Sequence, residues 1–215
     1  MAARFVEHAA SAVLDTAREL LARGLVDGTS GNVSARRSDG ALCITPTSVE
    51  YRVMTLDDLV VVDPSGQVLD GWRQPSSEIM LHLACYAAFP EVAGVVHSHA
   101  LHASMFAVAR QSVPAAVDEL AMYVGGEIAV TDYAPSGSAE LGDAAVRCLA
   151  DRGATLLANH GMVAVGRSPA DALHVTTVVE RAARIVAGAR ALGRVVALPG
   201  SGEDALDAYR SARHG

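Results

Sequence analysis

Residues 95–102 read VVHSHALH, and the two histidines that close the apolar run, His97 and His99, are separated by one residue. The run predicts a buried strand, on which side chains two positions apart point to the same side. A buried imidazole needs a hydrogen-bond partner or a metal ion, because an unpaired polar group in an apolar setting costs about 1–3 kcal/mol. The stretch therefore predicts a strand of a central sheet that ends at a pair of imidazoles.

The composition predicts one globular α/β domain. The 215 residues are 51% hydrophobic and 19% charged, which supplies enough apolar material for a sizeable core. The net charge is −7, and the 17 Lys and Arg residues are scattered, so we expect a small-molecule or subunit partner and neither nucleic acid nor membrane. The amino terminus has a helical pattern with acidic residues, unlike a signal peptide or a membrane span, which predicts a cytoplasmic protein.

The cysteines do not form a recognisable site. Cys43, Cys85 and Cys148 lie far apart and never in a C-x-x-C spacing. This spacing argues against a disulfide framework and against a thiolate zinc site. Any bound metal would therefore be held by histidine and carboxylate side chains.

Helical and extended segments are mixed along the chain without an internal repeat or a long linker, which predicts a single domain over residues 1–215. Apolar spacing and end signals predict five helices: one ending at Gly24, one starting at Ser76, and others over 100–110, 139–151 and 169–192. Short β-type runs lie between them. Strands embedded among helices predict an α/β/α sandwich, with a sheet between helical layers.

Two further residues extend the histidine pair into a candidate metal site. His160 follows another buried run, LLANH, so three imidazoles can converge at one sheet edge. Catalytic zinc sites typically use three protein ligands and leave a position for water or substrate. Glu78 is expected in the first turn of a helix, where it would either join the site or serve only the helix N-terminus.

Three short polar segments could hold an anion: GTSGN at 28–32, TPTS at 45–48 and the PSS that precedes Glu78. Glycine lets the backbone approach an anion closely, and a helix start offers free N–H groups. Neither glycine segment matches a nucleotide-binding loop, so a single phosphate or carboxylate is the expected anion. A metal beside a phosphate site fits Lewis-acid chemistry on a small phosphorylated carbonyl compound.

Taken in order, GTSGNVS, ITPTS, PSSE, VVHSHA and LLANHG resemble the class II aldolase and adducin family, of the L-fuculose-1-phosphate aldolase type, over roughly residues 1–195. The resemblance implies a single α/β domain with a mainly antiparallel sheet between helical layers. It also implies a homo-oligomer, a cyclic tetramer with sites between subunits. Residues 196–215 would then form a tail that contacts a neighbouring subunit.

By this resemblance, one Zn²⁺ or another divalent ion per subunit is held by His97, His99 and His160, while Glu78 is the acid/base group and a ligand when substrate is absent. The implied phosphate cradle comprises Gly31, Asn32, Thr47, Ser48, Ser76 and Ser77. The implied reaction is the reversible cleavage of a ketose 1-phosphate, such as L-fuculose 1-phosphate, into dihydroxyacetone phosphate and an aldehyde such as L-lactaldehyde. By the same resemblance, the metal would polarise the substrate's oxygens, and Glu78 would move the proton on the hydroxymethyl carbon.

The sequence departs from this family pattern at three places, one of which is Ser48 in place of a glycine of the phosphate loop; the other two concern the aldehyde half of the substrate. In the family, a tyrosine of the neighbouring subunit helps to protonate the aldehyde oxygen. The corresponding stretch of this sequence has Asp118 or Glu119 near that place. Tyr209 in the tail is then a better candidate for the catalytic proton donor than Tyr123. Ser136 stands where the family has a phenylalanine of the aldehyde pocket, which implies a different aldehyde.

Other activities of the same superfamily stay open, namely L-ribulose-5-phosphate 4-epimerase and methylthioribulose-1-phosphate dehydratase. Glu78 favours an aldolase because the epimerases tend to have Asp there, whereas Asp118 favours an epimerase. A non-catalytic, adducin-like binding module is disfavoured, since all three histidines and Glu78 are present. His82 and His102 are expected to support the site from outside the ligand set or to serve only the fold.

Overall fold

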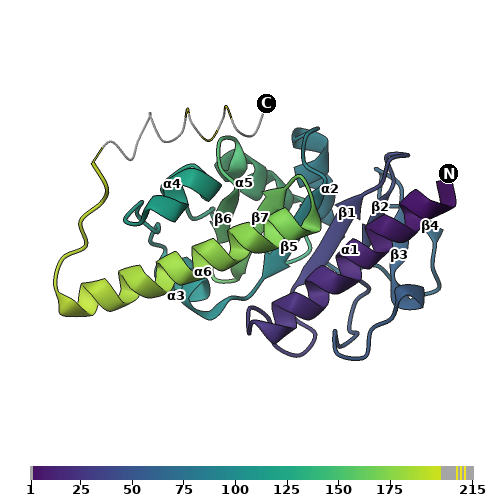
Figure 1. Ribbon diagram of the computed structural model, residues 1–215, viewed down its shortest axis with the longest axis horizontal. Coiled ribbons are helices and arrows are strands. Elements are labelled where there is room, and N and C mark those ends of the chain that lie inside the picture. The colour runs from purple at the N-terminus through teal and green to yellow at the C-terminus, as the bar shows by residue number, and fades with distance from the viewer. Residues whose placement is uncertain (1, 200–206, 208, 210, 212–215) are drawn as a thin grey trace.

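The computed structural model describes residues 2–199 together with 207, 209 and 211. The strands in this part of the chain are β1 (Asn32–Arg36), β2 (Leu42–Ile44), β3 (Val60–Val62), β4 (Val68–Asp70), β5 (Gly94–Ser98), β6 (Ala154–Leu157) and β7 (Gly161–Gly166). They form one sheet in the order β4-β3-β2-β1-β5-β7-β6 (Figure 1). Every neighbouring pair is antiparallel, which agrees with the mainly antiparallel sheet that the family resemblance implied.

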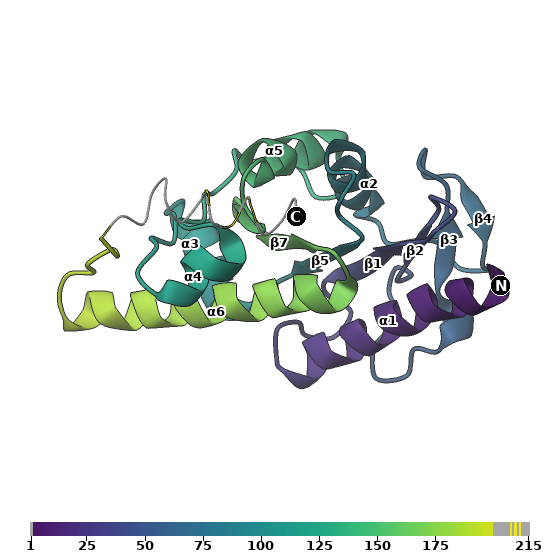
Figure 2. The ribbon, with the colours of Figure 1, turned by 45° about the horizontal axis from the view of Figure 1, so that its top comes forward.

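Helices cover both faces of this sheet, which confirms the predicted α/β/α sandwich. They are α1 (Ala2–Ala22), α2 (Ile79–Ala88), α3 (Leu101–Ala109), α4 (Asp118–Val124), α5 (Ala139–Leu149) and α6 (Pro169–Leu192), with a short 3₁₀ turn at Leu56–Asp58. Figure 2 shows α2 and α5 on one side of the sheet and α1 and α6 on the other. The helices α3 and α4 pack against α6.

The apolar core is split in two by the sheet. On β5, Val95 packs into the cluster shared with α2 and α5, and its neighbour Val96 packs into the cluster shared with α1, α3 and α6. Alternate residues of a strand face opposite sides, so a strand buried on both sides is apolar throughout. Burying one such valine stabilises the fold by about 1.5–3 kcal/mol. This is the physical reason for the apolar run that precedes His97.

At one end of the sheet, the termini of strands that lie far apart in the sequence come together. Because β1 is antiparallel to both β2 and β5, the start of β1 meets the ends of β2 and β5. The turn between β6 and β7 lies at the same end, since β7 is antiparallel to β5. In this register Asn32 of β1 pairs directly with His97 of β5. The antiparallel pairing therefore gathers four of the segments singled out in the sequence.

Among the described residues, no helix has the length and apolar character needed to cross a membrane. The cytoplasmic location and the single domain over 1–215 stay predictions. The tail expected at 196–215 is described in part: the N–H of Leu198 donates to the carbonyl of Ala115 at 2.9 Å. Its residues 200–206, 208, 210 and 212–215 lie outside the described part of the chain, so its contact with a neighbouring subunit also stays a prediction.

Candidate metal centre

Three imidazoles meet at the end of the sheet where β1 begins and β5 ends. His97 lies in β5, His99 follows that strand, and His160 lies in the turn between β6 and β7. Their ring centroids are 4.7–5.0 Å apart. Gly161, which follows His160, leaves no room for a side chain, because an added Cβ would lie 2.9 Å from Cδ2 of His99. The expected convergence of the three histidines is thus present in the fold.

Glu78 completes the cluster from the helix side. Its Oε2 lies 3.0 Å from Nε2 of His97, and its Oε1 lies 3.2 Å from Nε2 of His160. His99 is the fourth member, and one ligand atom from each of the three histidines and Glu78 lies within 4.8 Å of the others. The sequence predicted Glu78 in the first turn of a helix, and this prediction is wrong by one position. Glu78 is the N-cap residue of α2, which begins at Ile79. Its side chain makes no capping hydrogen bond, because its oxygens face the histidines instead.

The hydrogen bonds of the cluster suit a bound cation. Nδ1–H of His97 donates to the carbonyl of Met162 at 2.8 Å, which fixes the ring so that Nε2 faces the cluster. This Nε2 lies 3.0 Å from Oε2 of Glu78 and 3.0 Å from Nε2 of His99. A divalent cation that takes nitrogen and oxygen ligands could be held between these atoms. The donor set therefore fits a divalent metal ion.

The ionisation states also favour metal binding. Burial lowers the pKa of His99 to about 4, and the neighbouring imidazoles add to the shift; the pKa of His160 is lowered for the same reasons. Burial alone would raise the pKa of Glu78, but its contacts with His97 and Asn32 outweigh this and hold the pKa well below its usual value. At neutral pH His99 and His160 are then uncharged and Glu78 is ionised, the forms that ligate metals.

Acid should destabilise the metal-free protein. His82 and His99 titrate near pH 6.5 when unfolded, whereas burial lowers their pKa values in the fold to about 3 and about 4. At a pH between the folded and the unfolded pKa values, the unfolded chain binds more protons than the folded chain. The free energy of unfolding therefore decreases as the pH falls below about 6.5. We expect the melting temperature of chelator-treated protein to be level from pH 7 to 8 and to fall steadily from pH 6.5 to 4.5. A melting temperature that rises over that acidic range would contradict the assignment.

A pocket of about 150 Å³ opens beside the cluster. It is lined by Glu78, His99 and His160 together with all six residues expected in the phosphate cradle, Gly31, Asn32, Thr47, Ser48, Ser76 and Ser77. Gly31 has a φ of 77°, and an added Cβ would lie 2.6 Å from Cγ1 of Val26. The hydroxyl of Tyr51 donates to the carbonyl of Gly31 at 2.7 Å and fixes this loop. The structure thus brings the candidate phosphate residues and three of the four candidate metal ligands to one cavity.

Tyr209 lies outside this pocket. It lines a different cavity, of about 390 Å³, together with Tyr123. A Cβ added to Gly125 or to Gly153 would lie 2.9 Å from an atom of Tyr209, so the tyrosine packs closely on both glycines. Asp118 begins α4 and is likewise not among the residues that line the Glu78 pocket. The role of Tyr209 as a proton donor, toward the site of a neighbouring subunit, stays a prediction.

Ser136 makes a contact with Glu78 that sequence reasoning missed. Its hydroxyl donates to Oε1 of Glu78 at 2.8 Å, at the exposed mouth of the pocket. The resemblance had placed Ser136 in the aldehyde pocket, without any link to the carboxylate. No local pattern could reveal this contact, because 58 residues separate the two positions.

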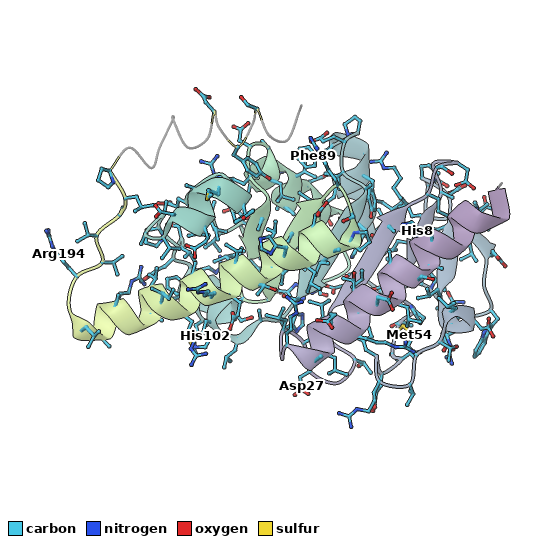
Figure 3. All side chains as sticks on the ribbon, in the orientation of Figure 1. His8, Asp27, Met54, Phe89, His102 and Arg194 are labelled. Carbon is cyan, nitrogen blue, oxygen red and sulfur yellow. The ribbon has the colours of Figure 1, made fainter. Side chains whose placement is uncertain are left out.

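His102 is bound to a second residue that the sequence did not single out. Its Nδ1 lies 2.7 Å from Oε1 of Glu180 on α6. Figure 3 labels His102 beside this helix. Glu180 also accepts hydrogen bonds from the N–H groups of His102 and Ala103 in the first turn of α3. A carboxylate at a helix N-terminus is stabilising. His102 therefore ties α6 to the helix that follows His99, and it lies outside the ligand set.

Comparison with known proteins places this arrangement in a family. The sequence model of the class II aldolase and adducin N-terminal domain matches residues 11–187. The chain belongs to the class II aldolase and adducin family. The family assigned from the five ordered motifs is thereby confirmed.

Individual relatives differ in the activity that their names give. A 5-methylthioribulose-1-phosphate/5-deoxyribulose-1-phosphate aldolase of Escherichia coli O45:K1 is 40% identical over 73% of this chain and 72% of its own. An L-fuculose phosphate aldolase of Escherichia coli K12 is 39% identical over 71% and 70%, and an L-ribulose-5-phosphate 4-epimerase of Salmonella paratyphi A is 35% identical over 94% and 91%. A solved L-fuculose 1-phosphate aldolase superposes with a TM-score of 0.89 at 29% identity, over 96% of each chain. Class II aldolase membership and a Glu/His cluster able to hold a metal follow from these observations; the individual reaction does not.

Proposed function

We propose that the protein is a zinc-dependent aldolase that cleaves a ketose 1-phosphate reversibly into dihydroxyacetone phosphate and an aldehyde. The observation that carries this proposal is the shared pocket: Glu78, His99 and His160, which are three of the four candidate metal ligands, line one cavity of about 150 Å³ together with the six cradle residues. A carbonyl next to a phosphate-bearing carbon could therefore reach the metal while its phosphate rests in the cradle. The names of the relatives, which include L-fuculose phosphate aldolase, support the same substrate class.

The ligand set proposed for Zn²⁺ is His97, His99, His160 and Glu78. When bound, the ion would act as a Lewis acid that polarises the substrate's carbonyl oxygen. The cradle would hold the phosphate through the hydroxyls of Ser76 and Thr47 and through backbone N–H groups of its loops. Another divalent ion that accepts imidazole ligands could take the same place.

Glu78 is proposed as the acid/base group. In the condensation direction its carboxylate takes a proton from the hydroxymethyl carbon of dihydroxyacetone phosphate, and that carbon forms a bond to the carbonyl carbon of the aldehyde. The aldehyde oxygen receives a proton, for which we propose Tyr209 of a neighbouring subunit in a homotetramer. Cleavage reverses these steps, so the C–C bond breaks and Glu78 returns its proton to the carbon. The contacts with His97 and Asn32 that lower the pKa of Glu78 also make it a weaker base, so we propose that Glu78 moves away from the imidazoles when substrate binds.

The aldehyde is the part of the substrate that the pocket mouth selects. We propose L-fuculose 1-phosphate or a related deoxy-ketose 1-phosphate as substrate. Ser136 is exposed at this mouth and holds Glu78 through its hydroxyl. A serine there leaves more space than the phenylalanine of the family pattern, which favours aldehydes with longer substituents.

The decisive test is a condensation assay. Zinc-loaded protein is incubated with dihydroxyacetone phosphate and a panel comprising L-lactaldehyde, glycolaldehyde, acetaldehyde and methylthioacetaldehyde, and new phosphosugars are detected by mass. We expect condensation with at least one aldehyde. Ser136→Phe, as a matched variant, should lose the bulkier aldehydes first while it still condenses the small ones. Absence of every condensation product would reject the aldolase.

An epimerase is the second candidate, because the epimerase relative matches over 94% of this chain. The same incubation with L-ribulose 5-phosphate identifies it: an epimerised pentose phosphate without any condensation product would replace the aldolase by the epimerase. Loss of water from methylthioribulose 1-phosphate would instead identify a dehydratase. Protein that is purified without zinc and cannot rebind it would instead support a non-catalytic, adducin-like binding module.

A further inference from the structure

A chain of buried hydrogen bonds runs from Glu78 into the core between β1 and α2. Asn32 Nδ2 is 2.9 Å from Glu78 Oε2, and Asn32 Oδ1 is 2.5 Å from His82 Nε2. On its other side, His82 Nδ1 is 2.6 Å from Ser34 Oγ, which lies 2.8 Å from the Tyr86 hydroxyl. Asn32 and Ser34 are two apart on a strand, and Glu78, His82 and Tyr86 are four apart along a helix, so each set shares one face.

Every member of this chain is shielded from water. Their exposed fractions range from 0% for Ser34 and His82 to 6% for Glu78. Arg36 closes the inner end, where its guanidinium lies 5.0 Å from the Tyr86 ring centroid and donates to the Tyr86 carbonyl at 2.7 Å. A buried polar group without a partner costs about 1–3 kcal/mol, so a chain of this length persists only if each hydrogen has its acceptor.

The carboxylate at the outer end fixes the direction of every hydrogen bond. Ionised Glu78 can only accept, so the Asn32 amide must present its N–H to it and its Oδ1 to His82. His82 must then carry its proton on Nε2 and accept at Nδ1. Ser34 therefore donates to His82, and the Tyr86 hydroxyl donates to Ser34. Burial keeps the imidazole neutral by lowering its pKa to about 3, which agrees with this single pattern.

We propose that His82 is a positioning residue that holds the Asn32 amide in the orientation that donates to Glu78. This rests on the proposed function, in which Glu78 moves the proton. If the Nε2–H of His82 were lost, Oδ1 of Asn32 would be a buried acceptor without a donor. The amide could then turn over and set its oxygen against the carboxylate. His82 thus controls both the placement of Glu78 and the Asn32 group that lines the phosphate pocket.

Two substitutions at the same position separate positioning from packing. In His82→Gln, the side-chain amide nitrogen can take the place of Nε2 and still donate to Asn32. In His82→Asn, the shorter amide reaches only the Ser34 side. We expect His82→Asn to lower kcat of the full-length zinc-loaded protein by about 10- to 100-fold, the range typical of residues that orient metal ligands, with His82→Gln restoring most of it. The control Cys85→Ala, at a buried position of the same helix, should lower the melting temperature without this loss.

Two readouts do not need the aldolase reaction. Histidine-selective ¹⁵N labelling of the wild-type protein should show His82 as a neutral Nε2–H tautomer, with its signal assigned by its disappearance in His82→Asn. Competition with a chromophoric chelator should show weaker zinc binding in His82→Asn than in His82→Gln. These results would stand even if the wild-type protein condensed no aldehyde, which would reject the proposed function alone.

Three outcomes would overturn the proposal. An Nδ1–H tautomer of His82 in the wild-type protein would mean that the Asn32 amide faces the other way. Equal losses of kcat and of zinc affinity in the two variants, in step with their melting temperatures, would show a role in packing only. Unchanged kcat and zinc affinity in a folded His82→Asn would show no role. If neither variant folds, the wild-type tautomer alone decides.

Discussion

Glu78→Gln keeps the metal and loses most C–C bond cleavage. Three imidazoles are enough to retain zinc, and the glutamine has nearly the same shape, but its amide cannot accept the proton of the hydroxymethyl carbon. Positioned acid/base groups contribute about 100- to 10,000-fold to a rate, so we expect kcat to fall within that range. The measurement pairs the cleavage rate with elemental analysis of zinc. Solvent exchange of the hydroxymethyl proton of dihydroxyacetone phosphate should disappear along with turnover.

The matched control is Glu140→Gln, which removes the same charge from an exposed position in the first turn of α5. It should leave kcat and zinc content unchanged. Turnover of Glu78→Gln close to that of the wild-type protein would remove Glu78 from the mechanism. Loss of zinc together with turnover would instead make Glu78 an essential ligand and leave its role in proton transfer to the exchange experiment.

His160→Ala is expected to lose the metal. His160 supplies one of three imidazoles, and its Nε2 lies 3.2 Å from the Glu78 carboxylate that would share the ion. With two histidines left, the site falls below the three protein ligands typical of catalytic zinc. Elemental analysis after gel filtration should find zinc far below one equivalent, and turnover should be lost to the same extent.

His174→Ala provides the comparison, since His174 is an exposed histidine of α6 whose ring packs edge-on against Tyr123, away from the cluster. It should keep a full equivalent of zinc. Full zinc content in His160→Ala would show that the ligand set is wrong at this position. Partial content that is restored by excess zinc would mean that Glu78 takes over part of the binding.

The helices could be predicted where their end signals are local. The predicted start at 169 is right because Ser168 Oγ accepts from the N–H of Asp171 and Pro169 occupies the first helical position. The short helix α4 and the strand β4 were not predicted. Seven residues give α4 little periodicity, and all three residues of β4 are exposed, so it has no buried face to mark it. The order of strands depends on pairings between distant segments and could not be inferred.

The candidate site could be predicted as a set of residue types but not as a set of contacts. The H-x-H spacing and the histidine after LLAN pointed to the imidazoles because strand ends place them at an edge. The role of Met162 could not be inferred, since it contributes only a backbone carbonyl to His97. The chain behind Glu78 did leave a signal, the spacing of Glu78, His82 and Tyr86 by four residues. That signal became specific only once β1 was known to lie against α2.

Gly161 limits how this site can change in evolution. Any side chain there would overlap the Ser98 carbonyl and crowd the ring of His99, so the hairpin cannot acquire a new group without displacing an imidazole. Position 136 at the pocket mouth carries no such restriction, because Ser136 is exposed to solvent. New specificities should therefore arise by substitution at the mouth while the hairpin is inherited unchanged, and a randomised library at position 161 should return glycine almost alone.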